Sequence, residues 1–185
     1  FADWISLEIL NIGTSVQKIH GQAFRNCTKL KEINFSESVD YIGEYAFYGC
    51  YNMKGTLKLS EDLVTIGQYA FSRNSSNNTN MGFSGSLVIP NKVKTIGNYA
   101  FNYCTNLKGS LNLPESLTSI GNYAFYYCSG FTGDLIIPKN VKTIVSSTFF
   151  NCAKLTNVKL SEGLTKIETN VFRGCTSLSN LQLPS

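Results

Sequence analysis

The sequence predicts an α/β-type repeat solenoid, in which one short strand and a set of turns recur along a single elongated domain. A nine-residue motif, Ile-Gly-x-Tyr-Ala-Phe-x-x-Cys, runs from Ile42 to Cys50, from Ile96 to Cys104 and from Ile120 to Cys128. Related copies begin at Ile19, Ile66, Ile144 and Ile167. Successive copies therefore start 23, 24, 30, 24, 24 and 23 residues apart. A nearly fixed period in the low twenties is typical of stacked coils, which bury their apolar faces against one another.

An apolar-x-apolar pair lies ahead of each motif. Its period of two predicts a short strand with one buried face. A Pro or Ser after most of the pairs ends the strand, and one Phe per copy supplies the core. The pairs are Leu10/Ile12, Ile33/Phe35, Leu57/Leu59, Leu87/Ile89, Leu111/Leu113, Leu135/Ile137, Val158/Leu160 and Leu181/Leu183. The Phe column is Phe24, Phe47, Phe71, Phe101, Phe125, Phe149 and Phe172.

The spacers between motif and strand differ in length by one residue. The longer spacers follow Cys50, Cys104 and Cys128, and each has a glycine two places before the strand. An extra residue beside a glycine predicts a bulge or tight bend that keeps the coil in register. These glycines are Gly55, Gly109 and Gly133.

The domain prediction is a single solenoid over residues 1–185, with about seven repeats of 23–24 residues. The step of 30 contains a six-residue Ser/Asn/Thr insertion at 75–80, which we expect to project as a loop. Phe1 and Trp4 take the Phe and Cys places of a preceding copy, and Pro184 directly follows the last strand. We therefore expect a fragment of a longer array, whose unpaired ends could associate end to end.

The composition excludes several classes of protein. Hydrophobic residues make up 43% of the chain and charged residues 15%, which argues against disorder. The net charge of +4 is spread out, so no nucleic-acid partner is expected. No apolar run approaches the roughly 18 residues of a membrane span, so direct membrane insertion is not expected.

The six cysteines share one place in the repeat and are expected to form a structural ladder. The coil spacing of roughly 4.7–4.9 Å would permit disulfides, but equivalent side chains point the same way, which favours free buried thiols. No metal is expected, because the chain has neither a Cys-x-x-Cys motif nor a column of histidines. The ladder is Cys27, Cys50, Cys104, Cys128, Cys152 and Cys175.

The remaining candidates for chemistry do not form a catalytic set. His20 is the only histidine and stands where other copies have Gly. The acids Glu37, Glu61, Glu115 and Glu162 recur at the turn after the strand, where solubility and turn formation explain them. We therefore predict a protein that is not an enzyme, with no catalytic residues and no cofactor.

A tyrosine column has two interpretations. Stacked rings would stabilise the array, which we favour, but tyrosine is also common at interfaces. The column is Tyr45, Tyr69, Tyr99 and Tyr123.

These residues resemble the BspA-like, or Treponema pallidum-type, leucine-rich repeats. Residues 107–114, followed by Ile120 to Cys128, match that family's Leu-x-x-Ile-x-Leu-Pro and Ile-Gly-x-x-Ala-Phe-x-x-Cys pattern, with one extra residue. The resemblance implies a right-handed coil with a concave parallel sheet and short 3-10 or helical turns. It also implies a secreted or cell-surface protein, and several members are adhesins that bind host matrix or plasma proteins. Val145, Thr148, Glu168 and Val171 depart from the pattern, so the last two coils are expected to be less regular.

The candidate binding residues lie between the two apolar residues of each strand and should face solvent on the concave sheet. They are Asn34, Lys58, Val88, Asn112, Ile136, Lys159 and Gln182. Val88 and Ile136 are apolar and suggest a contact patch, although isolated exposed aliphatics are common. The 75–80 loop is a second candidate. The sequence thus favours a protein-binding surface module over an architectural spacer or stalk in a larger surface protein. The resemblance implies host extracellular-matrix or plasma proteins as its partners.

Overall fold

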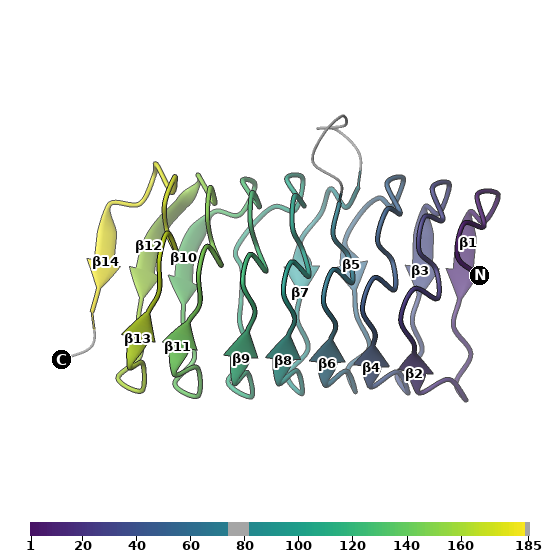
Figure 1. Ribbon diagram of the computed structural model, residues 1–185, viewed down its shortest axis with the longest axis horizontal. Helices are drawn as coiled ribbons and strands as arrows, with labels where there is room; N and C mark the ends of the chain where they lie inside the picture. The colour runs from purple at the N-terminus through teal and green to yellow at the C-terminus, as the bar shows by residue number, and fades with distance from the viewer. Residues whose placement is uncertain (74–81, 184–185) are drawn as a thin grey trace.

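The computed structural model describes residues 1–73 and 82–183, and it is a solenoid of parallel strands (Figure 1). The coils lie side by side along the long axis, and most of them contribute to two ladders of strands on opposite sides of the array. The predicted solenoid of short parallel strands is confirmed. The predicted short helical turns are wrong, because the described residues contain tight turns and no helix. The insertion at 75–80 lies outside the described residues.

The first ladder forms at the predicted apolar-x-apolar pairs. Its pairings are β1–β3, β5–β7 and β10–β12–β14, all parallel. Leu111 to Leu113 is not a strand, although Leu111 is buried and Asn112 exposed, so the alternation of burial persists without the pairing. The strands are β1 Ile9–Asn11, β3 Glu32–Asn34, β5 Leu57–Lys58, β7 Leu87–Val88, β10 Gly133–Ile136, β12 Leu155–Lys159 and β14 Asn180–Gln182.

The second ladder consists of two-residue strands, and each strand ends at the isoleucine of its motif. Its pairings run in the orders β2-β4-β6-β8-β9 and β11-β13. Six of the seven isoleucines are buried, the exception being Ile167 in the last coil. The strands are β2 Lys18–Ile19, β4 Tyr41–Ile42, β6 Thr65–Ile66, β8 Thr95–Ile96, β9 Ser119–Ile120, β11 Thr143–Ile144 and β13 Lys166–Ile167.

In the segment after each second-ladder strand from β2 to β11, the backbone N–H group of every second residue donates a hydrogen bond to a carbonyl of the next coil. The amides of Tyr45 and Phe47 donate to the carbonyls of Gln68 and Ala70 at 2.8 Å, whereas the amide of Ala46 between them donates within its own coil. Tyr45 has a φ of 54°, a left-handed conformation that bulky residues rarely adopt. The same conformation recurs at Tyr69, Tyr99 and Tyr123. Hydrogen bonding between coils therefore offsets a backbone cost in each repeat.

The core is built from columns of equivalent side chains. The phenylalanines stack in one continuous series from Phe1 to Phe172, with ring centroids between 5.3 Å (Phe47 to Phe71) and 5.7 Å (Phe149 to Phe172). Neighbouring planes differ by 8° or less. Offset stacking of this kind adds to the apolar burial of each ring. Each coil is thus stabilised mainly by its two neighbours.

The longer spacers bend as the sequence predicts. Gly55, Gly109 and Gly133 have φ values of 73°, 78° and 76°, which a residue with a Cβ rarely adopts. The register of the β10–β12 pair shifts between Gly133 and Asp134. In this coil the extra residue is therefore absorbed at the first residue of β10.

The last coils keep most of the pattern despite their substitutions. The Thr148 side chain is buried in place of alanine, and its hydroxyl donates to the carbonyl of Val145 at 2.7 Å. The amide of Phe149 still donates to the carbonyl of Val171 at 3.1 Å. The expected irregularity appears in two features, since β9 and β11 are not paired and Ile167 of the last coil is exposed.

Candidate functional site

The seven candidate binding residues form one exposed column on the first ladder, which we call the strand face. All seven are exposed, while the apolar residues on either side of them are mostly buried. Register pairing places Lys58 beside Val88, and Ile136 beside Lys159. The strand face consists of Asn34, Lys58, Val88, Asn112, Ile136, Lys159 and Gln182.

The centre of the strand face is mainly aliphatic, and a lysine lies on each side of it. Val88 is 50% exposed and Ile136 is 55% exposed, with Asn112 in the coil between them. Lys58 precedes Val88 by one coil, and Lys159 follows Ile136 by one coil. An apolar centre with a charged rim is the usual arrangement of a protein interface.

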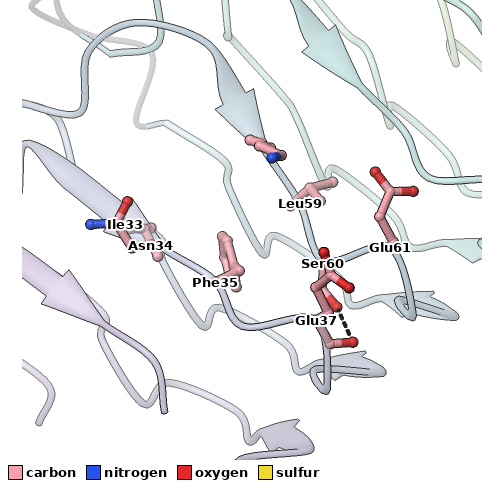
Figure 2. A pocket seen from close by; sticks show the side chains of 8 residues that line it. Ile33, Asn34, Phe35, Glu37, Leu59, Ser60 and Glu61 are labelled. Carbon is pink, nitrogen blue, oxygen red and sulfur yellow. Dashed lines mark hydrogen bonds between the residues drawn. The ribbon is translucent and has the colours of Figure 1, made fainter. Parts of the chain in front are cut away.

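Two shallow hollows lie on the strand face. Figure 2 shows the first, a hollow of about 180 Å³ between β3 and β5. There the Ser60 hydroxyl donates to the backbone carbonyl of Glu37 at 3.0 Å, which ties the turns of two coils together. Its lining is Ile33, Asn34, Phe35, Glu37, Lys58, Leu59, Ser60 and Glu61.

The second hollow lies over β10, β12 and β14 and measures about 280 Å³. Ile136, Lys159 and Gln182 of the strand face line it, beside Asp134 and Asn157. The Asn157 amide donates to the Asp134 carboxylate at 2.6 Å. Both hollows are smaller than the roughly 300–1,000 Å³ of a small-molecule site, so they suit side chains of a partner better.

The six cysteines are buried free thiols. Each donates its S–H to the backbone carbonyl of a phenylalanine in the preceding coil, as Cys128 does to Phe101 at 3.1 Å and Cys152 to Phe125 at 3.2 Å. Burial raises the pKa of Cys50 and of Cys104 to about 12. A thiol that stays protonated is a poor nucleophile, so the ladder acts as a structural column.

The other candidates for chemistry lie apart. His20 is exposed, and its ring is 6.3 Å from that of Tyr41. Glu37, Glu61, Glu115 and Glu162 are exposed at the turns. Within residues 1–73 and 82–183, no group of three or more His, Cys, Asp and Glu side chains could hold a metal ion. No helix in this part of the chain is long and apolar enough to cross a membrane.

The tyrosine column stacks tightly along the array and stays partly exposed. Tyr45, Tyr69, Tyr99 and Tyr123 have ring centroids 4.6–4.7 Å apart. The Arg25 guanidinium lies 6.0 Å from the Tyr45 ring, at the N-terminal end of this stack. The stacking supports the structural interpretation, while the exposure leaves the outer edge of the column available for contact.

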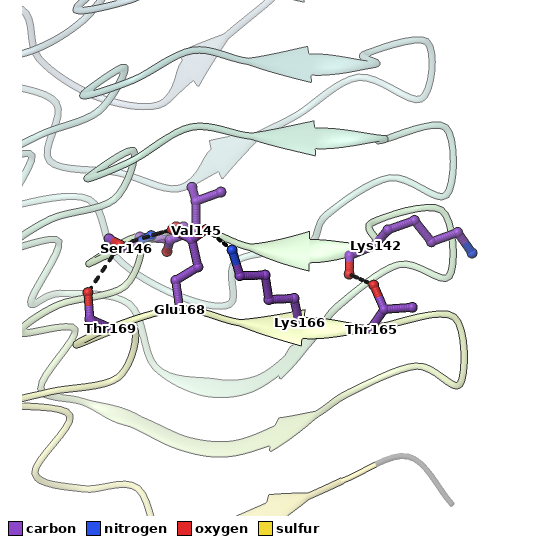
Figure 3. A network of polar contacts seen from close by, with 8 residues as sticks. Lys142, Val145, Ser146, Thr165, Lys166, Glu168 and Thr169 are labelled. Atoms are coloured by element: carbon purple, nitrogen blue, oxygen red, sulfur yellow. Dashed lines mark hydrogen bonds and ion pairs between the residues drawn. The ribbon is translucent and has the colours of Figure 1, made fainter.

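A polar network at the second ladder was not expected from the sequence (Figure 3). Ser146 donates to the Glu168 carboxylate through both its amide, at 3.1 Å, and its hydroxyl, at 3.0 Å. Lys166 pairs with the same carboxylate at 2.8 Å, and this hydrogen bond is the main cause of the lowered pKa of Glu168. The signal in the sequence was Glu168 itself, which stands where most copies have glycine.

Comparison with solved structures supports the fold. The chain is similar to a Treponema pallidum leucine-rich repeat protein, with 26% identity and a TM-score of 0.61, over 96% of this chain and 70% of the other. It also resembles a leucine-rich cell-surface protein of Faecalibacterium prausnitzii, with 22% identity and a TM-score of 0.55, over 100% of this chain and 56% of the other. The pneumococcal vaccine antigen PcpA shares 21% identity with a TM-score of 0.51, over 96% of this chain and 51% of the antigen. The chain thus spans about half the length of the last two proteins.

The sequence comparisons identify the family. No curated protein matches the chain. The model of the BspA-type leucine-rich repeat region matches residues 1–87 and 79–185, in six copies. These matches cover the motif, the strand pairs and the Phe and Cys columns described above. The chain therefore belongs to the BspA-type leucine-rich repeat family.

Proposed function

We propose that the strand face binds protein partners, and that the chain is a non-catalytic, adhesin-like module of a secreted or cell-surface protein. Membership of a leucine-rich repeat family indicates a protein-interaction module in general terms. The observation that supports the specific proposal is the exposed pair Val88 and Ile136, flanked by Lys58 and Lys159.

The physical case rests on what the strand face offers to a partner. Covering the exposed halves of Val88 and Ile136 releases water from apolar surface, at roughly 25 cal/mol per Å² buried. The two lysines at the rim attract acidic groups and add to the association rate more than to the affinity. A complementary partner would therefore carry an apolar centre between acidic side chains.

The cellular location is proposed from structural relatives. The F. prausnitzii relative is described as a cell-surface protein, and PcpA is described as a vaccine antigen. Both share the fold of this chain. We accordingly propose an extracellular location and host extracellular-matrix or plasma proteins as partners.

The test is binding to immobilised extracellular-matrix and plasma proteins, measured beside a Val88→Asp, Ile136→Asp variant. A matched control, Thr132→Asp with Ser177→Asp, makes the same change in charge at exposed positions of the spacers. We expect saturable binding that falls at least tenfold in the strand-face variant and stays unchanged in the control.

Two outcomes would reject the proposal. Binding retained by the strand-face variant would move the site to another face of the array. The absence of saturable binding to every protein in the panel would favour an architectural spacer.

A further inference from the structure

The side of the array opposite the strand face carries three parallel rows of uncharged polar side chains. Figure 1 shows the strands of the second ladder and the segments that follow them on this side. Each row has one member in each of the three central coils, and all members are at least partly exposed. We call these nine residues the tyrosine face: the hydroxyl row Thr65, Thr95 and Ser119, the amide row Gln68, Asn98 and Asn122, and the ring row Tyr69, Tyr99 and Tyr123.

The rows are in register from coil to coil. Thr65 pairs with Thr95, and Thr95 with Ser119, in the second ladder. In the amide row, the Asn98 side chain donates to the Gln68 side chain at 3.4 Å and accepts from the backbone N–H of Asn122 at 2.8 Å. A ligand lying along the array would therefore meet the same chemistry in each coil.

A strip of bare backbone separates the hydroxyl row from the amide row. It consists of Gly67, Gly97 and Gly121, which are partly exposed. A Cβ on Gly97 would lie 2.5 Å from the backbone nitrogen of Gln68, so a side chain there would require the backbone of the preceding coil to shift. Backbone and flanking polar groups thus remain accessible to a flat ligand.

Charge is absent from this face in the three central coils and in the coil that follows them, whereas Glu44 and Lys166 take places of the amide row and the hydroxyl row in the flanking coils. Segments 65–72, 95–104, 118–128 and 143–152 contain no Asp, Glu, Lys, Arg or His, in a chain with 16 basic and 12 acidic residues. Lys94 and Lys142 lie at the border, directly before the hydroxyl row and its continuation at Thr143. Arg73, directly after the first segment, is buried.

The exposed part of the ring row is polar as well as aromatic. Because the rings of Tyr69, Tyr99 and Tyr123 stack on one another at 4.6 Å, the stacked faces are covered, and the partly exposed surface of each side chain lies outside the stack. Burial raises the pKa of Tyr69 and Tyr99, so their phenols stay neutral. Hydroxyls and carboxamides both donate and accept hydrogen bonds, and neither carries charge.

This chemistry distinguishes among ligand classes. A nucleic acid needs cations for its phosphates. A protein partner brings charged side chains, which lose hydration on docking and would find no counter-charge here. A neutral polyhydroxylated chain has no charge to desolvate, and its repeating hydroxyls match a repeating set of donors and acceptors. Several weak contacts along one chain then combine into useful avidity.

We infer that the tyrosine face binds an uncharged polysaccharide lying along the array, as a function separate from protein binding at the strand face. The residues in contact are the amide row, the hydroxyl row and the outer edges of the tyrosines.

The test is retardation of the chain in native affinity gels that contain hydroxyethyl cellulose, glucomannan, dextran, laminarin or glycogen. Heparin and alginate serve as anionic comparisons. An Asn98→Asp, Asn122→Asp variant removes amide donors and adds charge with little change in size. Its matched control is Asn11→Asp with Asn180→Asp, which makes the same chemical change at exposed positions of the first ladder. Thermal unfolding of each variant verifies that it is folded.

We expect at least one neutral polysaccharide to retard the wild-type chain and the control, with at least a tenfold loss of affinity in the amide-row variant. Failure of all five neutral polysaccharides, or binding restricted to the anionic ones, would overturn the inference. Equal retardation of the folded amide-row variant would also overturn it. Loss of protein binding in the amide-row variant would show that this face serves a protein partner instead. The Val88→Asp, Ile136→Asp variant should keep its polysaccharide binding, so the two proposals can fail separately.

Discussion

The two long sides of the array differ in what is repeated on them. Along the tyrosine face the side chains change little, from Thr to Ser, from Gln to Asn, and not at all in the ring row. Along the strand face they change at almost every coil, from amide to lysine to aliphatic and back. Both faces rest on the same columns of Phe and Cys, so the backbone does not impose this difference.

The comparison separates the positions that stacking between coils constrains from those that are free to vary. Buried columns repeat because each coil must present the same surface to its neighbour. A column exposed on a strand has no such constraint, so its variation can encode one particular partner. The tyrosines are partly exposed and also stack between coils, so their repetition serves stability and, on our inference, a repeating ligand.

The largest expected effect is the response of the buried cysteine column to alkaline pH. Burial raises the pKa of Cys50 and Cys104 to about 12, and that of Cys128 and Cys152 well above the usual 9.0. The unfolded chain loses these protons above pH 9 while the folded chain keeps them, so stability is complete below pH 9 and falls above it. At pH 10 each such thiol should cost about 1.4 kcal/mol, and the four together about 6 kcal/mol.

Urea denaturation at pH 8, 9 and 10 measures this loss. A Cys128→Ala, Cys152→Ala variant should lose less stability over the same interval. An equal slope in the variant would mean that the thiols do not cause the effect.

The next effect separates a core position from an exposed one. Phe101→Ala removes a ring that is fully buried and stacked between Phe71 and Phe125, and should destabilise the chain by about 3–5 kcal/mol. Val88→Ala on the strand face should change stability by less than about 0.5 kcal/mol. Similar denaturation midpoints for the two variants would contradict the separation of core from strand face.

A glycine of the bare strip gives a third comparison. Gly97→Ala places a Cβ against the backbone of the preceding coil and should cost about 3 kcal/mol, because that backbone cannot move independently. The same change at Gly13, where no atom lies within 4 Å of the new Cβ, should leave stability nearly unchanged. Thermal melts of both variants test this, and tolerance of Gly97→Ala would show that the coils can separate locally.

The smallest stability effect concerns the ring row. Tyr99→Ser copies the residue that the sixth coil has at this place and removes two ring stacks, at a cost of about 1–3 kcal/mol. Tyr99→Phe keeps the stacks and should stay within about 0.5 kcal/mol of the wild type. A large loss in Tyr99→Phe would shift the stabilising role from the ring to the hydroxyl.

The sequence predicted features that have a period or a special residue type. The pairs such as Leu57/Leu59 alternate, which predicts strands, and Gly133 beside an extra residue predicts a bend. The second ladder was missed because each of its strands contributes one buried isoleucine, which has no period of its own. The left-handed Tyr69 was missed because the preference of tyrosine is for other conformations, and hydrogen bonds between coils override it. The exposed column was predicted by alternation, whereas its two hollows depend on side-chain positions across coils.

The most direct test of the central claim is an aspartate scan along the strand face. Each of its seven residues would be changed singly to Asp, and the affinity for a protein partner from the panel would be measured for every variant. Our account predicts the largest losses at Val88 and Ile136, smaller losses at Lys58, Asn112 and Lys159, and little change at Asn34 and Gln182. A flat profile along the array would contradict the claim that this face holds the protein-binding site.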